Sequence, residues 1–186
     1  GFFALTALST QTDPKKAPIP FDKDRSGFVM GEGSGALVLE SLAHAKARGA
    51  KILGEIVGYG SNCDAFHMTA PDPTGEGATM AMQLALDEAK LKPAQVDYIN
   101  AHGTATKAND AAEAKAINLV FGEDSRVLVG STKAMTGHLL GAAGAIEAIA
   151  VVASLQKGRL PVNIGMTEQD KECKVNVVTQ AKAHPE

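Results

Sequence analysis

The feature that most constrains the fold is a repeated unit in which a short apolar strand leads through a polar turn into a helix. In the first unit the expected strand is residues 96–99 and the helix is residues 110–121; in the second they are residues 127–129 and 142–155. Strands joined by a helix pair in parallel, because the crossover returns the chain to the same end of the sheet. The sequence therefore predicts an α/β fold with a parallel sheet.

Each of the two strand-to-helix turns carries a histidine beside a glycine. They are His102, in residues 100–106, and His138, in residues 131–144. Ligands bind at the carboxyl ends of parallel strands, so both imidazoles are expected to converge on one pocket. A neutral imidazole N–H can donate to an oxygen that becomes negative during a reaction. A lone histidine is more often a packing residue, but two on successive turns favour a functional site.

The rest of the sequence predicts shorter elements around these two units. Asp110 is expected to cap the helix that follows it, with Glu113 three residues later in a capping box. Strands are expected at residues 28–31, 35–40, 52–59 and 175–178, and helices at residues 1–10, 41–48 and 77–91.

The composition excludes several classes of protein. A chain of 186 residues has the length of one sizeable domain, and 18 basic against 21 acidic residues, with no basic block, makes nucleic acid an unexpected partner. No apolar run is expected to span a membrane, and the start is not a signal peptide. Cys63 and Cys173 have no metal-binding or redox spacing, which fits the cytoplasm. The apolar start, residues 1–8, is expected to belong to a longer protein.

Three motifs, in order and with matching spacing, resemble those of the β-ketoacyl-acyl carrier protein synthases. Residues 100–106, with Asp110 and Glu113 after them, resemble the family's NAHGTST…D..E motif. Residues 131–144 resemble STKSMTGHLLGAAG, and residues 20–33 resemble PFDKDRDGFVLGEG. The resemblance covers almost the whole chain and is closest to the elongating synthase II branch.

The resemblance implies a thiolase-like fold, in which residues 1–186 form one C-terminal ketoacyl synthase domain of the layered αβαβα architecture, truncated at both ends. It implies a decarboxylative Claisen condensation, in which malonyl-acyl carrier protein loses CO2 and attacks an acyl chain held on a cysteine. It also implies acyl carrier protein as a partner, the N-terminal half of the same enzyme as another, and a homodimer. No metal or cofactor is expected apart from the phosphopantetheine that carries the substrates on the carrier protein.

The same resemblance assigns residues to roles. His102 and His138 match the catalytic histidines that hold the malonyl thioester oxygen, and Lys133 matches the active-site lysine. The alternative to a catalytic role is that Lys133 and Glu147 form an ordinary surface ion pair. The alternative to an acyl-chain contact is that Phe2 is a plain core residue. The supporting residues are Glu147, Asp110 and Glu113; the residues matched to the pantetheine arm and acyl chain are Thr104, Thr106, Thr69 and Phe2.

The sequence departs from the family pattern in substitutions and in an absence. Ala105, Lys107 and Asn109 replace the usual serine, proline and glycine, and Lys107 is expected to alter the pocket entrance or carrier docking. Neither Cys63 nor Cys173 matches the family's nucleophilic cysteine, and the C-terminal GFGGTN strand has no match either. The chain alone is therefore expected to be inactive.

Three other functions remain open from the sequence. One is a ketosynthase domain of a modular polyketide synthase. Another is a non-catalytic subunit of the chain-length-factor kind, although retention of both histidines and Lys133 speaks against it. A thiolase is less expected, because thiolases carry a catalytic cysteine where the second histidine stands.

Overall fold

A two-stranded parallel sheet lies at the centre of the computed structural model, which describes residues 1–181. Strand β1 (Tyr98–Asn100) pairs with β2 (Leu128–Gly130) in parallel, with Ile99 opposite Val129. The predicted parallel pairing is therefore confirmed, with each strand shifted by one or two residues toward the C-terminus.

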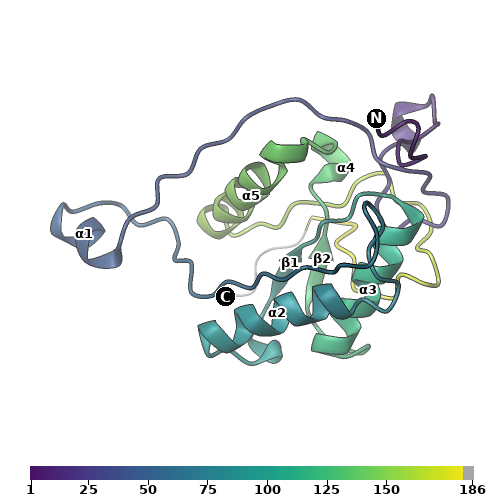
Figure 1. Ribbon diagram of the computed structural model, residues 1–186. Coiled ribbons are helices and arrows are strands. Elements are labelled where there is room, and N and C mark those ends of the chain that lie inside the picture. The colour runs from purple at the N-terminus through teal and green to yellow at the C-terminus, as the bar shows by residue number, and fades with distance from the viewer. Residues whose placement is uncertain (182–186) are drawn as a thin grey trace.

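Helices lie on both sides of this sheet (Figure 1). Helices α2 (Glu76–Ala89) and α3 (Lys107–Phe121) pack against each other on one side. Helix α5 (Ala143–Lys157) lies on the other side, where the Asn100 Nδ2 group donates to the carbonyl of Glu147 at 3.3 Å. The shorter elements are α1 (Leu42–Ala47), α4 (Lys133–Thr136), η1 (Pro14–Lys16), η2 (Pro93–Gln95) and η3 (Leu140–Ala142).

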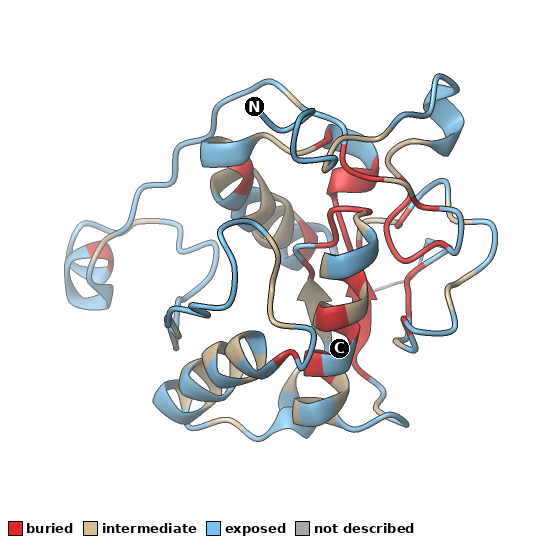
Figure 2. Cartoon of the chain, turned by 45° about the vertical axis from the view of Figure 1, so that its right-hand side comes forward, coloured by how far each residue is buried: buried red, intermediate tan, exposed pale blue. Residues whose placement is uncertain are grey.

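The core surrounds β2 and the inner face of α3 (Figure 2). Val129 of β2 and Ala114 of α3 are fully buried, and Ile117 is 1% exposed. Phe21 and Cys173 enter the same cluster from loops distant in the sequence. Because both helix α3 and the loop at Phe21 anchor in this cluster, the turns at the carboxyl end of the sheet have a rigid base.

A segment near the C-terminus extends the sheet beyond β2, but not as the strand expected at residues 175–178. Val177 forms a single parallel bridge with Val129. The Val129 amide donates to the Asn176 carbonyl at 2.9 Å, and the Val178 amide donates to the Val129 carbonyl at 2.8 Å. The pairing stays this short because the Val175 and Val177 amides donate to local carbonyls, those of Cys173 and Val175.

The strands expected at residues 28–31, 35–40 and 52–59 do not form, which corrects those predictions. The segments run as an extended arm that carries α1 away from the sheet (Figure 1). Gly35 packs against α5, and Gly58 lies on the backbone of α2. A strand needs a hydrogen-bonded neighbour, and among residues 1–181 the arm forms only two isolated bridges, Leu8 to Phe28 and Met30 to His138.

Two helix predictions also need correction. In place of a helix over residues 1–10, turns form at residues 2–6, with the Ala7 amide donating to the Phe2 carbonyl at 3.2 Å. Helix α5 was expected to be buried, yet within it only Ala143 and Ser154 are.

The expectation that no apolar run would reach the length of a membrane span is wrong as well. Leu140–Lys157, with a mean hydropathy of 1.3 and 11% of its residues buried, is long and apolar enough by length and composition alone. The run reaches this length because Glu147 is its only charged residue before Lys157.

Candidate active site

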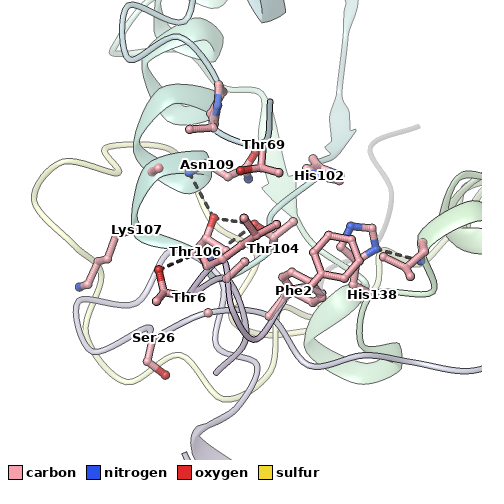
Figure 3. A pocket seen from close by; sticks show the side chains of 18 residues that line it. Phe2, Thr6, Ser26, Thr69, His102, Thr104, Thr106, Lys107, Asn109 and His138 are labelled. Atoms are coloured by element: carbon pink, nitrogen blue, oxygen red, sulfur yellow. Dashed lines mark hydrogen bonds between the residues drawn. The ribbon is translucent and has the colours of Figure 1, made fainter. Parts of the chain in front are cut away.

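The carboxyl end of the sheet opens into a cavity of about 440 Å³. Six of the ten residues singled out from the sequence line it (Figure 3), namely Phe2, Thr69, His102, Thr104, Thr106 and His138. The remaining four, Lys133, Glu147, Asp110 and Glu113, do not line it. The expected convergence of both histidine turns on one pocket is therefore observed.

The turn that carries His102 is held by a carboxylate beneath it. Glu113, on α3, accepts the backbone amides of His102 at 2.7 Å and of Gly103 at 2.8 Å. Gly103 has a φ of +40°, and a Cβ there would lie 2.4 Å from the Cβ of Ser131. Because only glycine fits, the Ser131 hydroxyl can donate to the Gly103 carbonyl at 2.8 Å and join the two turns directly.

The turn that carries His138 is held by the arm. Gly137, with a φ of +68°, ends helix α4. The His138 amide then donates to the Val29 carbonyl at 2.7 Å, and the Gly31 amide donates to the His138 carbonyl at 2.9 Å. The ring of Phe28 packs edge-on against the His138 imidazole, with ring centroids 5.2 Å apart. Backbone and ring contacts together fix this imidazole at the cavity.

The hydrogen bonds define which nitrogen of each histidine carries the proton. The Nδ1 atom of His138 accepts the Leu140 amide at 3.1 Å, so the proton of the neutral ring is on Nε2. The Nδ1 atom of His102 lies 3.4 Å from the Lys133 ammonium, which can only donate. The two rings are 5.2 Å apart and nearly perpendicular, at 86°. Both therefore offer an Nε2–H donor.

Lys133 is not part of a surface ion pair, the alternative that the sequence left open. It is 1% exposed and pairs with the Glu147 carboxylate, whose side chain is 20% exposed. Lys133 begins α4 and Glu147 lies in the first turns of α5, so the pair ties both helices to His102. The buried ammonium thus has a carboxylate on one side and an imidazole on the other, which bond two of its three donors.

The surroundings keep both imidazoles neutral at physiological pH. Desolvation by burial lowers the pKa of His102 to about 4, and the positive charge on Lys133 adds to the effect, as would a proton on His138. The same two causes, desolvation and then Lys133, lower the pKa of His138. A neutral imidazole with a fixed tautomer is suited to donate a hydrogen bond to a developing oxyanion.

Asp110 and Glu113 belong to α3, but not as its cap. Helix α3 begins at Lys107, and the Thr106 hydroxyl caps it by accepting the Asn109 amide at 3.2 Å. The prediction of Asp110 as the N-cap is therefore wrong. Asp110 is fully buried and accepts the amide of Phe21 at 2.8 Å, which leaves Thr106 as the cap.

The threonines form one wall of the cavity. The hydroxyls of Thr104 and Thr106 lie 3.0 Å apart (Figure 3). Lys107 points away from them, and its ammonium donates to the Lys23 carbonyl. The lysine that replaces the family's usual proline thus lies at the rim. Phe2, 37% exposed, packs edge-on against Phe28 with centroids 5.4 Å apart, so it lines the cavity and is not plain core.

Neither cysteine lies at the cavity. Cys63 is exposed on the loop before α2, and Cys173 is buried in the core. Burial raises the pKa of the Cys173 thiol to about 12, which keeps it protonated and unreactive.

Among residues 1–181, no group of three or more His, Cys, Asp or Glu is placed to hold a metal ion.

Sequence reasoning missed two residues that shape the site. Phe28 packs on His138, and Arg25 donates to the Thr106 carbonyl at 3.1 Å. Both lie in the motif at residues 20–33, which marked the resemblance but was given no role of its own. The motif includes the strand expected at residues 28–31, and this expectation concealed its contact with the histidine turns.

Comparison with known protein families gives two successive matches. Residues 53–167 match the family model described as the beta-ketoacyl synthase, C-terminal domain. The chain belongs to the beta-ketoacyl synthase family. Residues 1–45 match the N-terminal domain of beta-ketoacyl synthase. The apolar run at Leu140–Lys157 lies within the C-terminal match. That residues 1–186 form a single domain stays a prediction.

Curated relatives support the synthase II branch. The chain is 53% identical over 180 residues to 3-oxoacyl-[acyl-carrier-protein] synthase 2 of Synechocystis sp., covering 96% of this chain and 43% of that protein. It is 52% identical over 179 residues to the enzyme of the same name from Staphylococcus aureus, covering 96% and 44%. The chain thus spans less than half the length of these relatives.

Solved structures share the fold. A beta-ketoacyl synthase from Burkholderia phymatum superposes with a TM-score of 0.93 at 44% identity, covering 98% of this chain and 44% of that one. A type II polyketide ketosynthase, in complex with its acyl carrier protein and bound to the hexaketide, gives 0.95 at 39% identity, covering 99% and 46%. The predicted thiolase-like α/β fold is confirmed.

Proposed function

We propose that this chain supplies the decarboxylation site of a β-ketoacyl-acyl carrier protein synthase that elongates fatty acids. The observation that carries the proposal is the pair of Nε2–H donors, on His102 and His138, at one cavity. Both can donate to the thioester oxygen of a malonyl group. When the C–C bond to the carboxylate breaks, CO2 leaves and its electron pair becomes an enolate on that oxygen.

Lys133 acts on this step through His102. Its ammonium occupies the Nδ1 side of that imidazole, so the ring keeps its proton on Nε2, and its charge opposes protonation of the ring. Glu147 holds the ammonium in place. Thr104, Thr106 and Thr69 are proposed to bind the phosphopantetheine arm, and Phe2 to contact the acyl chain, because all four line the same cavity.

The enolate then attacks an acyl-cysteine thioester. The new C–C bond forms as the cysteine thiolate leaves, and the product is a β-ketoacyl thioester on the carrier protein. This chain has no matching cysteine, so the nucleophile is proposed to come from the N-terminal part of the enzyme. A cytoplasmic homodimer that takes acyl carrier protein as its partner is the proposed setting.

A polyketide ketosynthase is the second candidate. Its support is the 39% identity to a type II polyketide ketosynthase over 99% of the chain. Identities of 52% and 53% to fatty-acid elongating synthases favour the first candidate. Product analysis separates the two, because an elongating synthase takes saturated acyl carriers whereas a polyketide ketosynthase extends poly-β-keto chains.

A chimeric synthase tests the proposal. This chain replaces the matching 43% of the Synechocystis enzyme, which keeps the remainder of its own sequence. Given malonyl-acyl carrier protein and a fatty acyl chain loaded on acyl carrier protein, the chimera is expected to form β-ketoacyl-acyl carrier protein. The isolated chain is expected to form none. A folded chimera that cannot condense, or condensation by the isolated chain, would contradict the proposal. The unmodified Synechocystis enzyme is the control.

A further inference from the structure

Arg25 is a buried charged residue to which the proposed function gives no role. It is 1% exposed and lies in the loop between Phe21 and Phe28. A buried guanidinium costs free energy unless its donors are bonded, so its partners reveal what the burial achieves. Arg25 itself does not line the cavity.

The guanidinium holds the start of α3. Its Nε atom donates to the Thr106 carbonyl at 3.1 Å, and its Nη2 atom donates to the Lys107 carbonyl at 2.9 Å. The carboxylate of Asp110, in the first turn of the same helix, lies 3.6 Å from Nε. Three contacts therefore fix the turn that carries the Thr104 and Thr106 hydroxyls.

The same guanidinium also holds two loops. Its Nη1 atom donates to the Asp22 carbonyl at 3.0 Å and to the Asp170 carboxylate at 2.5 Å. Arg25 thereby joins its own loop and the loop near the C-terminus to α3. Arg25 is 81 residues from Thr106 and 145 residues from Asp170 in the sequence, so no local structure would hold these segments together.

Two of the joined segments are neighbouring walls of the cavity. Ser26, Gly27 and Phe28 follow Arg25 directly and line one side, while Thr104 and Thr106 line another. The Gly27 amide donates to the Ala105 carbonyl at 2.9 Å, a second link between the walls. The position of one wall relative to the other thus depends on the Arg25 bonds together with this backbone hydrogen bond.

We infer that Arg25 is a positioning residue that sets the threonine wall against the wall of residues 26–28 and so determines affinity for the pantetheine arm. The inference rests on the proposed role of Thr104 and Thr106. Lysine cannot replace it, because a compact ammonium cannot bond two successive carbonyls and a carboxylate in one plane. Arg25→Lys therefore keeps the positive charge but loses the planar set of hydrogen bonds to the two carbonyls and the carboxylate.

The test is a mutant cycle in the chimeric synthase. Arg25→Lys is expected to raise KM for malonyl carrier protein about tenfold and to leave kcat within about threefold. In a Thr104→Val, Thr106→Val background, the same change is expected to shift KM less than about twofold, because the contacts it positions are gone. Ile117→Ala, in the core face of α3, controls for lost stability and is expected to lower Tm without raising KM.

An equal rise of KM in both backgrounds, or an equal rise in Ile117→Ala, would overturn the inference. The dissociation constant of an amide analogue of acetyl-pantetheine is measured on the same variants. If the chimera does not condense but binding shows the coupling, the proposed function fails and the role of Arg25 stands. If the chimera condenses and neither KM nor binding shows the coupling, the role of Arg25 alone fails.

Discussion

The Lys133 ammonium lies 3.4 Å from the Nδ1 atom of His102, on the side of the ring turned away from its Nε2–H. This contact gives one imidazole its tautomer, and its charge adds to the burial that lowers the pKa of His102. A backbone amide, that of Leu140, fixes the tautomer of His138 in the same sense. The two donors are therefore set by different means, a charge and a peptide group, and can be perturbed separately.

Replacing Lys133 by methionine should raise the pKa of His102 from about 4 toward its ordinary value, because the cation that opposes protonation is gone. We expect decarboxylation by the chimera to fall at least about tenfold. Titration of the imidazole Cε1–H signals by NMR measures the shift. Lys46→Met, on the distant helix α1, is the control. An unchanged His102 titration would contradict the effect of the Lys133 charge.

The lowered histidine pKa values predict the response to acid. An imidazole whose pKa falls on folding takes up its proton first in the unfolded chain, so the free energy of unfolding should fall as pH drops from about 6.5 toward 4. Decarboxylation should persist below pH 6, because His102 stays neutral there. Urea unfolding and initial rates across this range measure both. An acid limb of the rate profile centred near pH 6.5 would disagree with neutral donors.

Thr106 has two separable functions. As the N-cap of α3 its hydroxyl accepts the Asn109 amide, and Thr106→Val should cost about 1 kcal/mol of stability. Because the Thr106 hydroxyl also lines the cavity, Thr106→Val should in addition raise KM for the carrier substrate. Ser41, the N-cap of α1, is the matched control, since Ser41→Ala should cost similar stability without changing KM. Equal KM effects from both variants would count against a pantetheine contact.

Glu113→Gln tests the support of the His102 turn. The amide nitrogen of glutamine would face a backbone N–H where a carboxylate oxygen now accepts one, so we expect a loss of about 1–3 kcal/mol in the free energy of unfolding. Chemical denaturation measures it. Glu123→Gln, in the loop after α3, is an exposed control that should change stability little. A Glu113→Gln variant as stable as this control would show that the two amide bonds contribute nothing.

Much of this site could be predicted because its determinants are local. Parallel strands end at one edge of a sheet, so the turns with His102 and His138 had to lie near each other. The start of α3 was less certain, since Thr106 and Asp110 are both good caps. Which of the two caps the helix depends on Phe21, which is 89 residues from Asp110 in the sequence. The Phe21 amide donates to the Asp110 carboxylate.

The arm could not be predicted from its pattern. Residues 35–40 and 52–59 have the apolar content of strands, but a strand forms only beside a partner. Val38, 86% exposed, and Ile56, 75% exposed, show that no described residue covers them. The contact of Phe28 with His138 was hidden for the same reason, because it depends on the course of the arm across the site.

His138→Ala in the chimeric synthase tests the central claim most directly. Transfer of the acyl group to the cysteine and release of CO2 from malonyl carrier protein are measured separately. Loss of one oxyanion donor should lower CO2 release about 10²–10³-fold and leave acylation within about threefold. Equal loss of both steps, or full retention of CO2 release, would contradict the role of His138 in stabilising the enolate.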